Sequence, residues 1–277
     1  MNKLIVVRGG GDIASGTIHR LYKAGYKKIL VLESEKPAAI RRAASFCEAL
    51  YEGMVYVEGV IGIKLNPKEF DKGLEAAFKG GMIPVCCDPL GKEISRLRPE
   101  IIVDAILAKK NMGTFKGMAP VVVALGPGFY AGKDADYVIE TMRGHNLGRI
   151  ITEGCALENT GVPGEIQGVS KERVIYSPVN GKIKASKEIG DIVKEGDIIA
   201  EIKTSDGNVT LIRATISGVL RGIIRDGYIV TDGLKIADID PRIEEKENCF
   251  TISDKARNIG GSVLEIVSAH YNADDKF

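Results

Sequence analysis

The stretch LIVVRGGGDIASG, residues 4–16, decides the architecture of this chain. A short run of β-branched residues enters three consecutive glycines and then an amphipathic stretch that reaches Leu21. This order predicts a strand, a glycine turn and a helix. Glycines let backbone N–H groups approach a pyrophosphate without a Cβ in the way, and the helix presents its positive end to the anion. The stretch therefore favours a nucleotide as the ligand.

The dinucleotide fingerprint G-x-G-x-x-G/A fits Gly9, Gly11 and Ala14. A second apolar run ends in Glu33, which lies close to the position where an acid binds the ribose hydroxyls. The predicted cofactor-binding residues at this end of the chain are Gly9, Gly10, Gly11, Asp12, Ala14 and Glu33. Another interpretation stays open, in which the glycines only form a turn and the carboxylate of Asp12 caps the helix and repels an anion.

The predicted cofactor is NAD or NADP. Glu33 favours NAD, because a carboxylate binds the free ribose hydroxyls. Arg41 and Arg42 follow closely and could bind a 2′-phosphate, although a solvated helix face also explains the pair. The phosphate state of the cofactor therefore stays open.

The composition limits the partners. The 277 residues suit two domains, and a net charge of +1 argues against nucleic acid and an acidic membrane surface. No apolar run reaches the roughly 18 residues of a membrane span. None of the five cysteines forms a C-x-x-C pair, so we expect a cytoplasmic protein. The three histidines lie far apart and predict no metal site, and the role of the adjacent Cys86 and Cys87 stays open.

Strand-like and helix-like segments alternate through the first part of the chain. The strand-like segments are 3–8, 28–33, 82–87, 100–104, 120–125 and 149–152, and the helix-like segments are 13–25, 38–50, 67–79 and 134–143. Gly53–Leu65 interrupts the pattern as a β excursion. Alternation of this kind is typical of a parallel sheet covered by helices. We therefore expect an α/β, Rossmann-like nucleotide-binding domain over residues 1–165.

The later part of the chain contains an internal repeat. Glycines recur with the same spacing at 181, 190 and 196 and again at 218, 227 and 233, an offset of 37 residues. Residues 174–240 resemble a biotinyl/lipoyl domain, an all-β barrel-sandwich hybrid. The hairpin tip Ser205–Asn208 lacks the lysine that this family modifies, and Lys203 falls before the turn, so the carrier function is not expected. Residues 250–277 are expected to contain a helix that packs back on the N-terminal domain, with Gly260-Gly261 permitting close backbone contact.

A second group of polar residues follows the buried strand at 121–125. Gly126 and Gly128 form another glycine turn at the end of a strand, where ligands bind in open α/β sheets. Arg143 and Arg149 flank His145 and suit an anionic ligand. His145 or Lys109 could supply a proton near neutral pH. The alternative is that Arg143 caps a helix and the rest is a turn.

Several motifs along nearly the whole chain resemble the YqeB family, accessory proteins of the selenium-dependent molybdenum hydroxylase system. They are GGGDIASG at 9–16, AIRR at 39–42, VEGV at 57–60, DAILAKKN at 104–111, ALGPGF at 124–129, IETMRGH at 139–145 and NTGVPG at 159–164. The resemblance implies a maturation role, a molybdenum hydroxylase or its maturation proteins as partners, and the molybdenum cofactor as a handled ligand. It supplies no reaction, so no catalytic residue can be transferred.

Three hypotheses follow. The first is a nucleotide-binding accessory protein that inserts or activates the cofactor of a selenium-dependent molybdenum hydroxylase. The second is an NAD(P)-dependent oxidoreductase of a small metabolite, and the third is a non-catalytic scaffold or docking module. Whether the chain is an enzyme, and whether it forms a homo-oligomer, stays open.

Overall fold

The computed structural model describes residues 3–162 and 164–274. Two compact units are present. Unit 1 comprises Met1–Pro37, Ser45–Thr160 and Ile252–Phe277, and unit 2 comprises Ala38–Ala44 and Gly161–Thr251. Pro163 of the 159–164 motif and residues 275–277 of the expected C-terminal segment lie outside the described residues.

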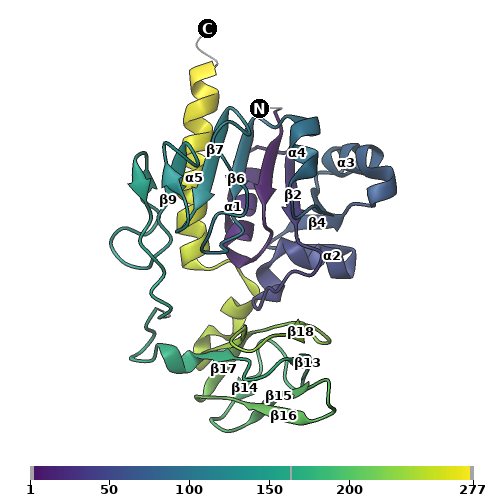
Figure 1. The fold of residues 1–277 in the computed structure, drawn as a ribbon, viewed down its shortest axis with the longest axis vertical. Coiled ribbons are helices and arrows are strands. Elements are labelled where there is room, and N and C mark those ends of the chain that lie inside the picture. The colour runs from purple at the N-terminus through teal and green to yellow at the C-terminus, as the bar shows by residue number, and fades with distance from the viewer. Residues whose placement is uncertain (1–2, 163, 275–277) are drawn as a thin grey trace. The chain divides into compact units, whose positions relative to one another are not determined.

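Unit 1 is built on a nine-stranded sheet with the order β10-β9-β7-β6-β1-β2-β5-β4-β3, within the described residues (Figure 1). Its strands are β1 (Ile5–Arg8), β2 (Ile29–Glu33), β3 (Met54–Val57), β4 (Val60–Lys64), β5 (Ile83–Cys87), β6 (Ile101–Asp104), β7 (Val121–Leu125), β9 (Tyr137–Ile139) and β10 (Ile150–Ile151). A separate two-stranded sheet pairs β8 (Tyr130–Ala131) with β11 (Gly154–Cys155).

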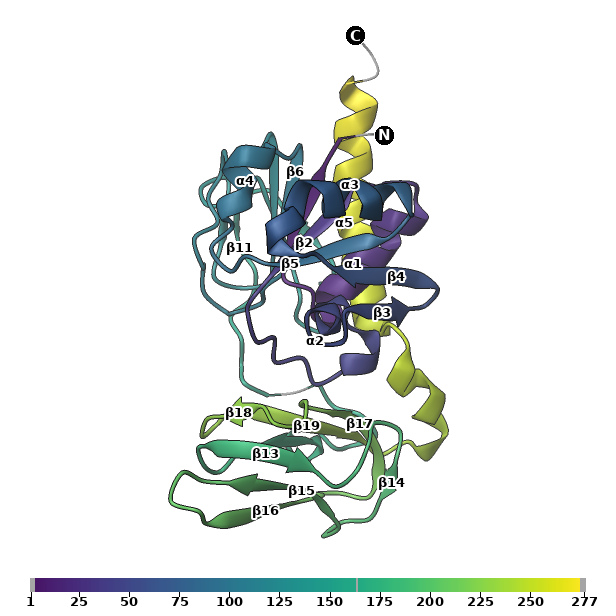
Figure 2. The same ribbon diagram turned by 90° about the vertical axis from the view of Figure 1, so that its right-hand side faces the viewer.

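Two cores cover the faces of the large sheet, because successive strand residues point to opposite sides. Ile5 and Val7 belong to the core under α1 (Asp12–Lys23) and α5 (Asp254–Asp274), whereas Val6 belongs to the opposite core. The other helices of this unit are α2 (Ala49–Glu52), α3 (Phe70–Lys79) and α4 (Lys92–Leu97), with short 3-10 turns η2 (Phe46–Glu48) and η3 (Pro67–Glu69). Both views show α5 alongside α1 (Figures 1 and 2).

Helix α5 crosses α1 at a pair of glycines. A Cβ at Gly260 would lie 2.8 Å from the carbonyl oxygen of Gly16, and a Cβ at Gly16 would lie 2.6 Å from the carbonyl oxygen of Ala256. The N-terminus of α5 has the expected cap, since the Ala256 amide donates to Ser253 Oγ at 3.2 Å. The crossing therefore depends on two residues that lack a side chain.

Unit 2 contains two four-stranded antiparallel sheets with the orders β12-β19-β17-β14 and β16-β15-β13-β18, within the described part of the chain (Figure 2). The strands are β12 (Val174–Tyr176), β13 (Gly181–Ala185), β14 (Ile192–Val193), β15 (Ile198–Lys203), β16 (Val209–Arg213), β17 (Gly218–Ile223), β18 (Ile229–Val230) and β19 (Lys235–Asp240). The unit also has the 3-10 turns η1 (Arg42–Ala44), η4 (Lys171–Arg173) and η5 (Ile243–Phe250).

The repeat expected from the glycine spacing is visible in these strands. Strands β13, β14 and β15 correspond to β17, β18 and β19 at an offset of 37 residues. The copies exchange short strands, because β14 pairs with β17 and β18 pairs with β13. Each sheet therefore contains strands from both copies.

The predicted fold class, a Rossmann-like parallel sheet followed by a biotinyl/lipoyl-like barrel, is wrong. The large sheet is mixed, because β3 and β10 pair antiparallel with their neighbours at its two edges. The excursion at 53–65 adds one of these edges as a hairpin that turns at Glu58 and Gly59, both with positive φ. The strands of unit 2 pair as two separate sheets and not as a closed barrel.

Two expected helices are also absent from the described residues. The segment 134–143 contains β9 instead, since the apolar run Tyr137–Ile139 extends the sheet beside β7. The segment 38–50 leaves unit 1 for unit 2 and returns, and only short turns and α2 form there. Apolar spacing alone does not separate a short buried strand from a helix.

Candidate functional site

Backbone groups of the triple-glycine bend form hydrogen bonds with other parts of the protein. The Gly9 amide donates to the carbonyl oxygen of Leu32 at 2.7 Å, and the Gly10 amide donates to Glu33 Oε2 at 2.8 Å. The carbonyl oxygen of Gly10 accepts from the Cys47 amide at 2.8 Å, and both Gly9 and Gly10 are buried. The amides of Gly9 and Gly10 are therefore already used within the protein.

The other predicted residues of this end have structural roles as well. Glu33 Oε1 accepts from the Ser34 amide at 2.6 Å, and Glu33 Oε2 accepts from the Gly10 amide. Both carboxylate oxygens therefore bind backbone amides and do not face a ribose. Ala14 is buried in the core beneath α1. Gly11 precedes α1 and has open space around it, and Asp12 begins the helix. NAD or NADP as the cofactor stays a prediction, without the amides of Gly9 and Gly10.

The second glycine turn is used for packing. Gly126 and Gly128 have φ angles of +81° and +104°, which favour glycine. A Cβ at Gly126 would meet Thr141 Oγ1 at 2.8 Å, and a Cβ at Gly128 would meet the Lys110 backbone at 2.7 Å. Lys109 lies exposed on the same loop that Gly128 contacts. These glycines allow the loop after β7 to pack against the loops that follow β9 and β6.

Arg143 forms an ion pair with the first residue of α5. Its guanidinium donates to both carboxylate oxygens of Asp254 at 2.8 Å, in a bidentate ion pair at the surface. His145 and Arg149 are exposed, and their side chains make no hydrogen bond or ion pair within the described residues. The structure therefore gives these two residues no partner that would mark them as catalytic or ligand-binding.

Two buried charges in unit 1 have shifted pKa values. Burial raises the pKa of Asp104, which accepts a hydrogen bond from Thr114 and lies 3.6 Å from Arg8. Burial and the neighbouring Arg143 lower the pKa of Lys255, a half-buried residue of α5 that sequence reasoning missed. Nothing local marks Lys255, because its surroundings come from segments far away in the sequence.

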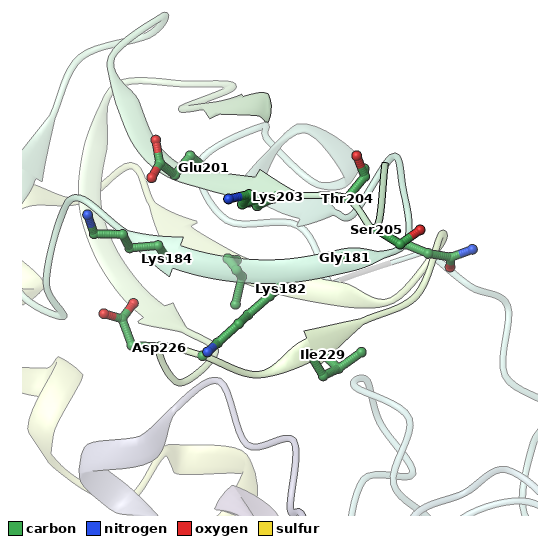
Figure 3. Close-up of a pocket in the computed structure, with 12 residues that line it drawn as sticks. Gly181, Lys182, Lys184, Glu201, Lys203, Thr204, Ser205, Asp226 and Ile229 are labelled. Atoms are coloured by element: carbon green, nitrogen blue, oxygen red, sulfur yellow. The ribbon is translucent and has the colours of Figure 1, made fainter. Parts of the chain in front are cut away.

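Unit 2 contains a groove of about 880 Å³ on one of its sheets (Figure 3). We name it the lysine groove, after three of the residues that line it. The lining residues are Asn180, Gly181, Lys182, Ile183, Lys184, Glu201, Lys203, Thr204, Ser205, Asp226, Gly227 and Ile229. Alternation along β13 and β15 places Lys182, Lys184, Glu201 and Lys203 on the outer face, whereas Ile183 and Ile202 enter the core.

The strand register places like charges together in the lysine groove. Lys182 lies directly opposite Lys203 on the neighbouring strand, and Lys184 lies opposite Glu201. Like charges in such a cross-strand pair are destabilising, whereas opposite charges are favourable. None of these three lysines forms an ion pair in the part of the chain that the structure describes. The sequence contains these lysines, but their juxtaposition depends on the register.

Asp226 lines the same groove but forms no ion pair with either lysine within the described residues. Its Oδ1 atom accepts a hydrogen bond from the Ala185 amide, which holds the carboxylate at the rim of the groove. The stem of Lys182 lies across the turn at Gly227, where a Cβ would come within 3.4 Å of Lys182 Cε. The groove therefore combines unpaired ammonium groups with polar side chains and the apolar Ile229.

The fold and the groove define a two-unit protein, with a mixed α/β unit and a unit of two antiparallel sheets. No family model matches the chain. It is 50% identical over 266 residues to protein YqeB of Escherichia coli strain K12, which is described as uncharacterized. The match covers 95% of this chain and 47% of that protein, so the chain spans about half the length of this relative. The identity supports a member of the YqeB family, as the sequence motifs predict.

Solved structures that match have low identity and low TM-scores. An apo structure of the ectoine utilization protein EutE (DoeB) from Ruegeria pomeroyi is 13% identical, covers 86% of each chain and has a TM-score of 0.28. A succinylglutamate desuccinylase from Silicibacter sp. TM1040 is 14% identical, with 86% of this chain and 84% of that chain covered and a TM-score of 0.27. An aspartoacylase family protein from Mesorhizobium loti is 13% identical, with 86% and 85% covered and a TM-score of 0.29. At these TM-scores the likeness supports no conclusion about activity.

The predicted function is wrong. A nucleotide-binding maturation factor and an NAD(P)-dependent oxidoreductase both require the glycine bend to be open, and the amides of Gly9 and Gly10 are bonded internally. Among the described residues, no group of three or more His, Cys, Asp or Glu is placed to hold a metal ion. No helix of the described chain combines the length and the apolar character that crossing a membrane requires.

Proposed function

We propose that this protein binds an anionic ligand in the lysine groove of unit 2. The single observation that carries the proposal is the cross-strand pairing of Lys182 with Lys203 on one sheet face, where neither lysine forms an ion pair among the described residues. An anion bridging the two ammonium groups relieves their repulsion and gains charge-assisted hydrogen bonds.

The surroundings favour an organic anion over a simple inorganic ion. Ile229 lies opposite Lys182 on its other side, and the stem of Lys182 adds further apolar surface. Asn180 and Ser205 offer hydrogen-bonding groups along the same groove, whereas the Thr204 hydroxyl donates to Asp206 within its own turn. A ligand with two or more carboxylates and an apolar part would contact the ammonium groups, the apolar surface and the hydrogen-bonding side chains together.

Isothermal titration calorimetry with citrate and with inorganic tripolyphosphate at low salt tests the proposal. Lys182→Gln and Lys203→Gln are each expected to weaken binding about tenfold, which corresponds to about 1.4 kcal/mol. Lys194→Gln is the matched control, because Lys194 is an exposed lysine of the same unit outside the groove. Equal affinity of the control and the groove variants, or no heat with either anion, would contradict the proposal.

The partners and ligands that the YqeB resemblance implies stay predictions. A molybdenum hydroxylase or one of its maturation proteins could use this groove only by presenting an acidic surface to it. The molybdenum cofactor as a handled ligand, and the connection to selenium, gain no support from the described residues.

A further inference from the structure

The internal repeat of unit 2 contains a second version of the sheet face that bears the lysine groove. Strands β13 and β15 of the groove correspond to β17 and β19 at an offset of 37 residues. Lys203 at the end of β15 therefore corresponds to Asp240 at the end of β19, and Lys182 corresponds to Val219. The two faces differ in charge at these two positions, whereas Lys184 and Glu201 correspond to Arg221 and Asp238 and keep theirs.

The chain itself covers the outer face of the second version. Asp240 follows a core residue and so points outward, yet it is only 1% exposed. Residues 38–44 lie against β17, because a Cβ at Gly222 would meet the carbonyl oxygen of Ile40 at 2.8 Å. Arg42 Nε donates to the carbonyl oxygen of the last residue of β17 at 2.9 Å, and η5 packs on the same strand. Asp240 itself accepts from Arg242 at 2.9 and 2.8 Å, so the covering segment meets this face through backbone atoms and does not pair with its carboxylate.

The equivalent face of the first version is uncovered and is lined by three lysines together with Glu201. The register aligns one row across its four strands, formed by Val209, Lys203, Lys182 and Ile229. All four side chains are exposed, with Val209 at 53% and Ile229 at 61%. The row therefore presents two ammonium groups between two apolar side chains.

We infer that the lysine groove binds an extended acidic segment of another polypeptide, laid across β13 and β15 as residues 38–44 lie against β17 in the second version. This inference rests on the proposed function and names the class of its ligand. The two lysines of the row, which form no ion pair among the described residues, determine the sign of the segment, and the apolar ends of the row determine its pattern, two acidic residues flanked by apolar ones.

The size of the row also favours a polypeptide over a small anion. Neighbouring strands lie about 4.8 Å apart, so four strands extend over about 14 Å, a distance that roughly four to five extended residues cover. A small tricarboxylate reaches the two lysines but cannot contact Val209 and Ile229 together. A segment of this length contacts the whole row.

Fluorescence anisotropy with labelled peptides tests the inference. The acidic probe has two glutamates between two leucines, the neutral probe has glutamines in their place, and the basic probe has the sequence of residues 38–44. We expect the protein to bind the acidic probe at least tenfold tighter than the neutral probe. The double variant Lys182→Glu with Lys203→Glu is expected to lose the acidic probe and to gain affinity for the basic probe, whereas Lys194→Glu changes neither.

The outcomes separate this inference from the proposed function. Binding of citrate together with equal affinity for the acidic and neutral probes overturns the acidic segment and leaves the anion site in place. Absence of binding to citrate, tripolyphosphate and all peptides overturns both. Circular dichroism of the double variant checks its fold, and the comparison of the probes on the unmodified protein needs no variant at all.

Discussion

The crossing of α1 and α5 allows a sharp test, because two neighbouring glycines of α5 differ only in what surrounds them. A Cβ at Gly260 would lie 2.8 Å from the carbonyl oxygen of Gly16 and 3.1 Å from Thr17 Cα, both backbone atoms of α1. A Cβ at Gly261 would have the end of the Arg20 guanidinium as its nearest neighbour, at 3.7 Å, which is an ordinary contact. Alanine at either position changes the intrinsic helix propensity by the same amount.

The expected free energies follow from these contacts. Gly261→Ala gains about 1 kcal/mol of unfolding free energy, because alanine is the better helix former. Gly260→Ala gains the same amount but forces the two helices apart, and overpacking of this kind costs about 1–3 kcal/mol. We therefore expect Gly260→Ala to be about 1–3 kcal/mol less stable than Gly261→Ala.

Urea unfolding followed by the helical circular dichroism band measures both variants against the unmodified protein. Gly261→Ala should move the midpoint to higher urea concentration, and Gly260→Ala should fall clearly below it. Equal stabilisation by the two substitutions would refute the tight crossing, because it would show that the space beside Gly260 is open.

Two further predictions concern charged groups of unit 1. Glu58 accepts hydrogen bonds from the Ile252 amide at 2.7 Å and from Arg257, so Glu58→Gln is expected to cost about 1–3 kcal/mol at neutral pH. Burial raises the pKa of Glu58, but the hydrogen bonds from Arg257 and Ile252 outweigh burial and lower the pKa overall. The stabilisation by the Glu58 carboxylate is therefore present above the ordinary glutamate pKa and is lost as the pH falls through the lowered value. Urea titrations at a series of acidic pH values should show the two proteins converge, and a constant difference would contradict this. Burial and Arg143 lower the pKa of Lys255, so Lys255→Met should stabilise the protein at neutral pH. The advantage of the methionine variant should shrink as the pH rises through the lowered lysine pKa towards the ordinary one. A loss of stability at neutral pH would show that the lysine has a favourable partner.

Local patterns in the sequence predicted much of the architecture. The β-branched run before Gly9 forms β1, and the glycine spacing of the repeat reappears as strands offset by 37 residues. Helix α5 also forms where an apolar stripe follows Ser253. These features depend on neighbours in the chain, so periodicity and turn chemistry are sufficient to find them.

The site could not be predicted in the same way, because it depends on residues distant in sequence. The Gly10 amide donates to the side chain of Glu33, 23 positions later, and the Gly10 carbonyl oxygen accepts from the Cys47 amide. The glycine pattern that predicts a phosphate site therefore forms an internally bonded turn. The pairing of Lys182 with Lys203 requires the register of β13 against β15. A shift by one residue would have moved one of these lysines to the other face of the sheet.

The central claim is that the unpaired lysines of β13 and β15 hold an anion. The most direct measurement is a calorimetric titration of citrate into the unmodified protein and into the double variant Lys182→Gln with Lys203→Gln, at two salt concentrations. We expect saturable binding that weakens with salt and is lost in the double variant. Binding of equal strength in both proteins would contradict the claim.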